Sequence, residues 1–315
     1  YLNPVNWGQS SWVWENNEER QWIDDIVKKT AIHNQQNGAY DLSIQVTIPN
    51  EWERIAPVNI GVTAGIETTK VAPIWLEKCN QMDKIITISE HSKKSLVDTF
   101  YEGIDQRTNQ RVKLQCDKEV DVVHYPVKQY DNIPNLNLNL STKFNFLTVA
   151  QWGPRKNLHN TVEWFVEEFI DNPEVGLVVK TFARGGSVLD RYTMENELDN
   201  FLKKYENRKC KVYLMHGDLS DAEMHSLYKD KNINALVSLT HGEGYGLPLF
   251  EAAYSGLPVL ATDWSGHLDF LYKPNKNKKG KTKSKAHFAK IDYELKPVQQ
   301  HAVWNGVIVA DSMWA

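Results

Sequence analysis

Two glutamates frame a glycine-rich segment in the second half of the chain. Glu243 and Glu251 enclose Gly244 and Gly246, and the stretch leads from an apolar segment into a helical one. Glycines let the backbone approach a ligand closely, and a helix N-terminus presents unpaired N–H groups that bind phosphate. Carboxylates accept hydrogen bonds from hydroxyl groups. A nucleotide sugar would use all of these groups; the alternative is an ordinary strand, loop and helix with surface glutamates.

A second polar segment, residues 151–157, also follows an apolar segment and opens a helix. Its Arg155 and Lys156 lie beside a helix N-terminus, where the helix dipole disfavours cations unless an anion binds there. We therefore predict that they clamp a diphosphate, with Gly153 of the same turn among the binding residues. The alternative is two solvated cations at the start of a helix.

The residues of these segments resemble a known family. E-G-Y-G-L-P-L-F-E-A-A (243–253) and S-G-L-P-V-L-A-T-D (255–263) resemble the E-x7-E signature of retaining glycosyltransferases with the GT-B fold, above all family 4. The resemblance is strongest over residues 144–271 and extends to residues 44–96. It implies an α/β fold with two Rossmann-like, doubly wound parallel-sheet domains facing a cleft. It also implies transfer of a sugar from a nucleotide-diphosphate sugar to an acceptor hydroxyl.

The resemblance assigns roles to residues that match the family's motifs. It implies that Glu243 touches sugar hydroxyls, Glu251 touches the nucleotide ribose, and Lys156 faces the diphosphate. Arg155 is the candidate for the family's arginine, although it adjoins the lysine instead of preceding it as in G-R-x-x-x-x-K-G. Backbone N–H groups of the glycine-rich turn would bind the phosphates or the transferred sugar; they belong to Gly244, Tyr245, Gly246 and Leu247.

Other candidate positions follow neighbouring strands. His216 and Gly217 would frame the nucleotide base, or they form an ordinary strand-end turn. Family members often carry a histidine in the N-terminal domain near the reacting sugar carbon, but the matching T-A-G-I-E segment has none. We predict that Glu67 supplies this polar contact; the alternative is a surface or capping role. We interpret His91 and His124 as loop or packing histidines.

Strand and helix patterns alternate along the whole chain. In the first half they predict helices at 17–30, 71–82 and 90–100 and strands at 41–48, 58–63, 84–89 and 120–125. In the second half they predict strands at 144–150, 176–181, 211–215, 233–240 and 258–262. Helices are expected at 157–170, at 190–205, after a capping box at Ser220, and from the glycine-rich turn to Gly256. Such repetition predicts parallel sheets, and ligands bind at the carboxyl ends of their strands.

The predicted organisation is an N-terminal acceptor-side domain (1–127), an asparagine-rich linker (128–143) and a C-terminal donor domain (144–315). A lysine-rich segment at 273–290 is expected to be a mobile loop that either is simply solvated or contacts an anionic acceptor. Such an acceptor would be a glycan, a lipid head group or a nucleic acid. The loop-like start and helix-free finish lead us to expect truncation at both ends, with a first strand and a bridging C-terminal helix missing.

Composition narrows the class of protein. The 315 residues carry a net charge of −4, so the whole surface is not a polyanion-binding field. The three cysteines are scattered, as in a reduced cytoplasmic protein, and no apolar run is long enough to span a bilayer. Peripheral contact with a membrane stays open.

No D-x-D motif stands in the donor segments, so we expect no metal and no cofactor beyond the donor. The rival functions are a non-catalytic or fragmentary nucleotide-sugar binding protein and an epimerase or phosphorylase of the same fold.

Overall fold

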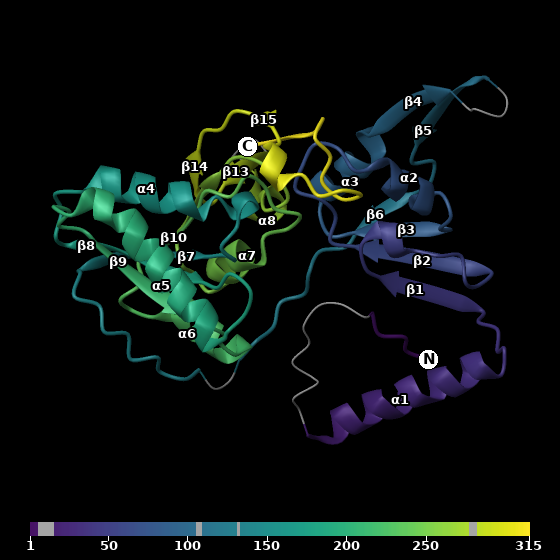
Figure 1. Ribbon diagram of the computed structural model, residues 1–315, viewed down its shortest axis with the longest axis horizontal. Helices are drawn as coiled ribbons and strands as arrows, with labels where there is room; N and C mark the ends of the chain where they lie inside the picture. The colour runs from purple at the N-terminus through teal and green to yellow at the C-terminus, as the bar shows by residue number, and fades with distance from the viewer. Residues whose placement is uncertain (6–15, 105–108, 131–132, 277–281) are drawn as a thin grey trace.

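The computed structural model describes residues 1–5, 16–104, 109–130, 133–276 and 282–315. Figure 1 shows two bodies side by side, each built around one parallel sheet, with a long helix α1 (Glu18–Gln35) at the N-terminal edge. The predicted α/β fold with two parallel sheets is therefore confirmed. No helix among the described residues is long and apolar enough to cross a membrane.

The N-terminal sheet has the strand order β1-β2-β3-β6, and all neighbours are parallel. The strands are β1 (Leu42–Val46), β2 (Val58–Thr63), β3 (Lys84–Thr87) and β6 (Val120–Val122). Helices α2 (Pro73–Cys79) and α3 (Glu90–Asp98) connect them, and right-handed crossovers made in one direction place both helices on the same face. Trp52 and Trp75 are fully buried on that side, whereas Ile44 and Val46 of β1 point the other way and stay exposed.

The C-terminal sheet has the order β14-β11-β10-β7-β8-β9. Its strands are β7 (Phe144–Val149), β8 (Val175–Thr181), β9 (Lys211–His216), β10 (Ala235–Ser238), β11 (Val259–Thr262) and β14 (Ala289–Ile291). The helices are α4 (Leu158–Phe169), α5 (Val188–Leu202), α6 (Asp221–Lys229), α7 (Leu247–Tyr254) and α8 (Leu268–Leu271). Leu177 and Val179 of β8 pack with α4 and α5, and Val178 between them packs with α6 and α7. The strand order reverses between β7 and β10, which is where such sheets bind ligands.

The capping box predicted at Ser220 is confirmed, because Ser220 and Glu223 form it at the start of α6. Ser89 caps α3 in a similar way by accepting from the Ser92 backbone. The strand predicted at 58–63 coincides with β2. Most other predicted ends are a few residues too long, because the last residues of these patterns serve as caps and turns.

The lysine-rich segment differs from the expected mobile loop. Its described parts form an antiparallel hairpin of β12 (Tyr272–Lys276) and β13 (Thr282–Ala286), followed by β14 in the main sheet. Tyr272 anchors the hairpin base, because its hydroxyl donates to Asp263 and its ring packs edge-on against Phe288. Lys283 is exposed on β13, whereas Lys278, Lys279 and Lys281 lie outside the described residues.

A second hairpin was not predicted. β4 (Phe100–Ile104) pairs with β5 (Arg111–Gln115), and Figure 1 shows both standing away from the N-terminal body. Their side chains are mostly exposed on both faces, so the sequence carries no alternation between buried and solvent-facing residues. That alternation is the signal by which a half-buried strand is predicted.

The last described segment returns to the N-terminal body. β15 (Lys296–Pro297) pairs with β16 (Met313–Trp314) around a short 3-10 turn η5 (Gln300–Ala302). Trp314 is fully buried in the same core as Trp52 and Trp75, and Thr69 exchanges two hydrogen bonds with Met313. The segment predicted as a linker contains no helix or strand in its described part and packs leucines against the C-terminal core. The domain limits 1–127, 128–143 and 144–315 stay predictions.

Candidate active site

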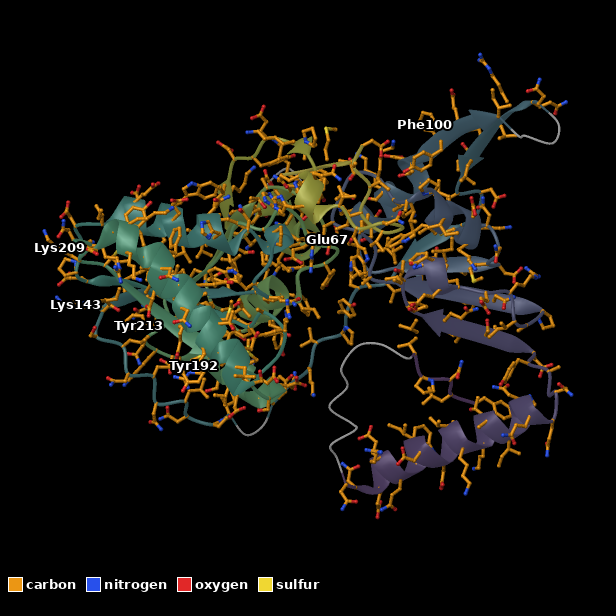
Figure 2. The ribbon with its side chains drawn as sticks, viewed as in Figure 1. Glu67, Phe100, Lys143, Tyr192, Lys209 and Tyr213 are labelled. Carbon is orange, nitrogen blue, oxygen red and sulfur yellow. The ribbon has the colours of Figure 1, made fainter. Side chains whose placement is uncertain are left out.

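The candidate site lies where loops from both bodies meet. In the C-terminal body, the 3-10 turn η3 (Pro154–Lys156) follows β7, the glycine-rich loop follows β10, and residues 263–267 follow β11. These strands are neighbours in the order β11-β10-β7, so their carboxyl ends place the three loops together. The loop after β2 faces them from the N-terminal body and carries Glu67, which Figure 2 labels near the centre of the molecule.

Two ion pairs occupy the centre of this site, and we call their four residues the charge cluster. Lys156 Nζ lies 2.5 Å from Glu243 Oε1, and the Arg155 guanidinium donates to the Glu67 carboxylate across the boundary between the bodies. The side chains of Lys156 and Glu243 are only 15% and 9% exposed, so salt screens this pair little. The structure thus brings together all four residues predicted to be catalytic.

The four charges of the charge cluster sum to zero, but its two carboxylates repel each other. Burial raises the pKa of Glu67, the Arg155 guanidinium opposes that increase, and the nearby Glu243 carboxylate adds to it. Two carboxylates so close to each other repel, and each is held by a cation. An anionic ligand could therefore compete with either carboxylate for its cation.

The glycines of the loop are required by close contact with neighbouring backbone. A Cβ added at Gly242 would collide with the Glu67 carbonyl oxygen, and one added at Gly244 would collide with that of Ala64. Gly246 has φ +90°, in the left-handed region that favours glycine, and begins α7 without a side-chain cap. The loop thus fits against the N-terminal body only because it lacks side chains at these positions.

The side chain of Tyr245 anchors the same loop. It is 4% exposed, and its ring centroid lies 5.3 Å from that of Phe250 and 5.0 Å from that of Phe270. On the facing body, the Ser89 hydroxyl donates to the Gly244 carbonyl at 2.5 Å. The sequence prediction assigned Tyr245 through its backbone, and the structure adds that its ring holds the loop in place.

His267, a buried histidine that was not predicted, is linked to the Glu243 backbone through the Ser265 hydroxyl. His267 Nε2 lies 2.7 Å from the Thr262 carbonyl oxygen, and its Nδ1 lies 3.4 Å from the Ser265 hydroxyl. Burial lowers the pKa of His267, so the neutral ring donates to the carbonyl and accepts from Ser265. The Ser265 oxygen in turn accepts from the Glu243 backbone at 2.9 Å. The available signal was the S-G-H sequence at residues 265–267, which begins three residues after the end of the strand predicted at 258–262.

His91 also belongs to the surroundings of the charge cluster. It lies in the first turn of α3, its ring stands edge-on to Trp264 at 5.0 Å, and its Nε2 is buried without a described hydrogen-bond partner. Burial lowers its pKa to about 4, although the Glu67 backbone acts in the other direction. The interpretation of His91 as a packing residue therefore leaves one buried polar atom without a role.

Glu251 lies in the second half of α7, where it lines a hollow of about 110 Å³ between α6 and α7. Burial raises its pKa, and the Tyr228 hydroxyl beside it opposes the increase. Leu247, the first residue of α7, lines the same hollow, and Lys128 and Tyr130 cover it from the linker. Glu251 is thus one helix turn or more beyond the charge cluster, on the α6 side.

The remaining predicted residues have partners of their own. His216 Nε2 lies 2.8 Å from an Asp190 oxygen, and the Gly217 carbonyl accepts from Lys180. Gly153 has extended backbone at the start of η3, and its carbonyl accepts from the Lys156 backbone. Within the described part of the chain, no three His, Cys, Asp or Glu side chains are grouped closely enough to hold a metal ion.

Residues 130–289 match a family model described as "Glycosyl transferases group 1". This match covers half of the chain and contains Arg155, Lys156, Glu243 and Glu251. The chain belongs to this family. A curated relative of this chain is the UDP-N-acetylglucosamine–peptide N-acetylglucosaminyltransferase GtfA subunit of Streptococcus agalactiae, 24% identical over 188 residues. The alignment covers 58% of this chain but only 31% of that protein.

Solved structures give the fold of this group 1 glycosyltransferase. A sucrose-phosphate synthase from Thermosynechococcus elongatus superimposes with a TM-score of 0.53 and 14% identity, over 83% of this chain and 66% of its own. A structure described as trehalose-6-phosphate from E. coli bound with UDP-2-fluoro glucose gives 0.52 and 11% identity, over 81% and 66%. These likenesses confirm the predicted GT-B fold.

Proposed function

We propose that this protein moves a sugar from a nucleotide-diphosphate sugar to an acceptor hydroxyl, with retention of anomeric configuration as in family 4. The charge cluster carries the proposal, because it holds two cations beside a glycine-rich loop and the uncapped start of α7. The relative named for UDP-N-acetylglucosamine and the E. coli structure with UDP-2-fluoro glucose support a UDP sugar as the first donor to test.

Donor binding would exchange the partners of the two cations. Phosphate oxygens form strong charge-assisted hydrogen bonds with both arginine and lysine. Lys156 would leave Glu243 and Arg155 would leave Glu67 when the diphosphate binds between them. Both carboxylates would then be free to accept hydrogen bonds from the sugar hydroxyls. In this proposal the glutamates hold the cations in position until the donor arrives.

The same cations would act during bond breaking. As the bond between the sugar C1 and the diphosphate oxygen breaks, negative charge accumulates on the leaving diphosphate. Lys156, Arg155 and the N–H groups at the start of α7 would stabilise that charge more in the transition state than in the ground state. The acceptor oxygen bonds to C1 on the same face, and its proton passes to an oxygen of the leaving phosphate. We propose that the cations take the role that a metal ion has elsewhere.

Two further groups of residues complete the proposed assignment. Glu251 would bind the ribose from its hollow between α6 and α7, with His216 and Gly217 near the base. The hairpin β12–β13 follows α8, which begins directly after His267, so its exposed lysines follow closely in sequence on the loop that supports Glu243. We propose that Lys273, Lys283 and Lys285 contact an anionic acceptor.

The three free cysteines support a reducing, cytoplasmic location.

The test is a panel of UDP, GDP and ADP sugars, with release of the nucleotide diphosphate measured alongside binding of each bare nucleotide. We expect one nucleotide to bind, and Lys156→Met to lower turnover at least a hundredfold while weakening ground-state binding much less. Lys209→Met is the matched control, because Lys209 pairs with Asp171 on the far surface of the same body (Figure 2). Binding without any release, with or without acceptor, would support the non-catalytic alternative; failure of every nucleotide to bind would refute the donor site.

A further inference from the structure

Two of the three cysteines lie against each other, far apart in sequence. Cys79 ends α2, Cys116 follows β5, and both side chains pack in the same apolar core. The Asn80 side chain fixes this contact, because its Nδ2 donates to the Gln115 carbonyl at 2.8 Å and its Oδ1 accepts from the Asp117 backbone at 3.0 Å. The backbone on both sides of Cys116 is thus tied to the residue that follows Cys79.

The two thiols have different surroundings. Cys79 is fully buried in the N-terminal core beside Trp75 and Met82, whereas Cys116 is half-buried at the surface of that core. The hydrogen bond from Cys79 lowers the pKa of Cys116 to about 7, in spite of partial burial. The same bond, together with burial, raises the pKa of Cys79. The half-buried Cys116 sulfur is therefore the one that a small disulfide can reach, and the buried Cys79 sulfur is the one that can follow it.

This arrangement has the features of an attacking and a resolving thiol. A thiolate with a pKa near ambient pH reacts well with small disulfides, and a second thiol in contact can displace the mixed disulfide. Cys210 offers an internal comparison, because it is buried in the C-terminal core without a second cysteine, and burial raises its pKa. We propose that Cys79 and Cys116 form a reversible disulfide, a modification site that links α2 to the β4–β5 hairpin.

The reaction balances with a small disulfide as oxidant. The Cys116 thiolate attacks one sulfur of glutathione disulfide and releases one glutathione thiolate. Cys79 then attacks the Cys116 sulfur, gives up its proton to the departing sulfur, and releases the second glutathione. The two protein thiols are oxidised by two electrons, and one glutathione disulfide is reduced to two glutathione thiols.

The bond would add to the contacts that Tyr101 of β4 and Leu114 of β5 already make with the N-terminal core. Figure 1 shows β4 and β5 projecting from the N-terminal body, and Phe100, labelled in Figure 2, is half exposed at the base. A covalent link one residue beyond β5 fixes the strand that returns to the body. We therefore expect amide hydrogen exchange in β4 and β5 to slow after oxidation, while exchange in the C-terminal sheet stays unchanged.

In the experiment the full chain is treated with glutathione disulfide and then denatured. The free thiols that remain are alkylated and counted. The count should fall from three to one, with an intact mass lower by two hydrogens and a Cys79–Cys116 crosslink in the non-reduced peptide map. Cys210→Ser should fall from two to zero. Cys116→Ser, at a half-buried position that tolerates the change, should keep both remaining thiols. Dithiothreitol should restore the parent count.

Three outcomes would overturn the proposal. A stable mixed disulfide between Cys116 and glutathione would show that Cys79 cannot resolve it. Disulfide-linked dimers without an internal crosslink would show that the sulfurs meet only between molecules. Retention of all three thiols, under conditions that oxidise free glutathione, would show that neither sulfur is reactive.

Discussion

Replacing Glu243 by glutamine should strengthen the binding of a bare nucleotide diphosphate while abolishing sugar transfer. In the free protein, Lys156 is held by Glu243 at 2.5 Å, and a diphosphate must displace that carboxylate. The charge-assisted hydrogen bond is worth about 1.5–3 kcal/mol, against about 1 kcal/mol for a neutral one. Glutamine would therefore lower the cost of displacement by about 0.5–2 kcal/mol, which is about a 2- to 30-fold gain in affinity.

The same substitution should lower the stability of the protein without nucleotide. Lys156 is 15% exposed and would lose its nearest anion, which lowers the free energy of unfolding by about 3 kcal/mol at most, since Glu67 is still near. Titration calorimetry with bare UDP, GDP and ADP measures the first effect, and chemical denaturation with and without nucleotide measures the second. Glu223→Gln, in the half-buried capping box of α6, is the control for removing one carboxylate away from the site. Weaker nucleotide binding by Glu243→Gln than by the parent would refute the exchange of partners.

Three other predictions test separate parts of the site. Gly244→Ala should place a methyl group against the Ala64 carbonyl oxygen and push the two bodies apart. This should lower the free energy of unfolding by about 1–3 kcal/mol and the rate of sugar transfer at least tenfold. Unaltered turnover would contradict this. Because burial lowers the pKa of His91 from 6.5 to about 4, the unfolded chain binds more protons between these values, so this residue should make stability rise by about 3 kcal/mol from pH 4 to 6.5. Denaturation curves of His91→Asn should show a shallower rise than the parent, and an identical pH profile would argue against it. Glu251→Ala should weaken nucleotide binding by about 1–3 kcal/mol and leave turnover at saturating donor near that of the parent; equal affinity in calorimetry would remove Glu251 from the site.

Sequence patterns located the residues of the charge cluster but not their partners. Glycine spacing and the strand before it placed Glu243 at the end of β10, and the same reasoning placed Lys156 after β7. The pairing of Arg155 with Glu67 depends on how the two bodies meet, which no local pattern encodes. His267 was overlooked because its place after a predicted strand does not show whether its ring is buried or exposed, and burial is what gives it a role beside Glu243.

The two hairpins show a different limit. β12 and β13 are rich in lysine, and the composition favours a solvated loop; their pairing follows from the anchor that Tyr272 makes with Asp263 and Phe288. In β4 and β5 only the paired residues Tyr101 and Leu114 are half-buried, and the other side chains are exposed. Prediction from hydrophobic period therefore succeeds where a strand or helix has one buried side, as in α4 and β2, and fails where tertiary contacts at one end decide the structure.

The return of the final segment to the first body affects how the protein is made. Val298, Val307 and Trp314 complete a core whose other members, such as Trp52 and Trp75, are translated far earlier. While the ribosome synthesises the whole second body, the first has an unfilled apolar pocket that chaperones or a partner chain can reach. A premature stop codon close to residue 298 would thus spare the body built last and damage the one built first.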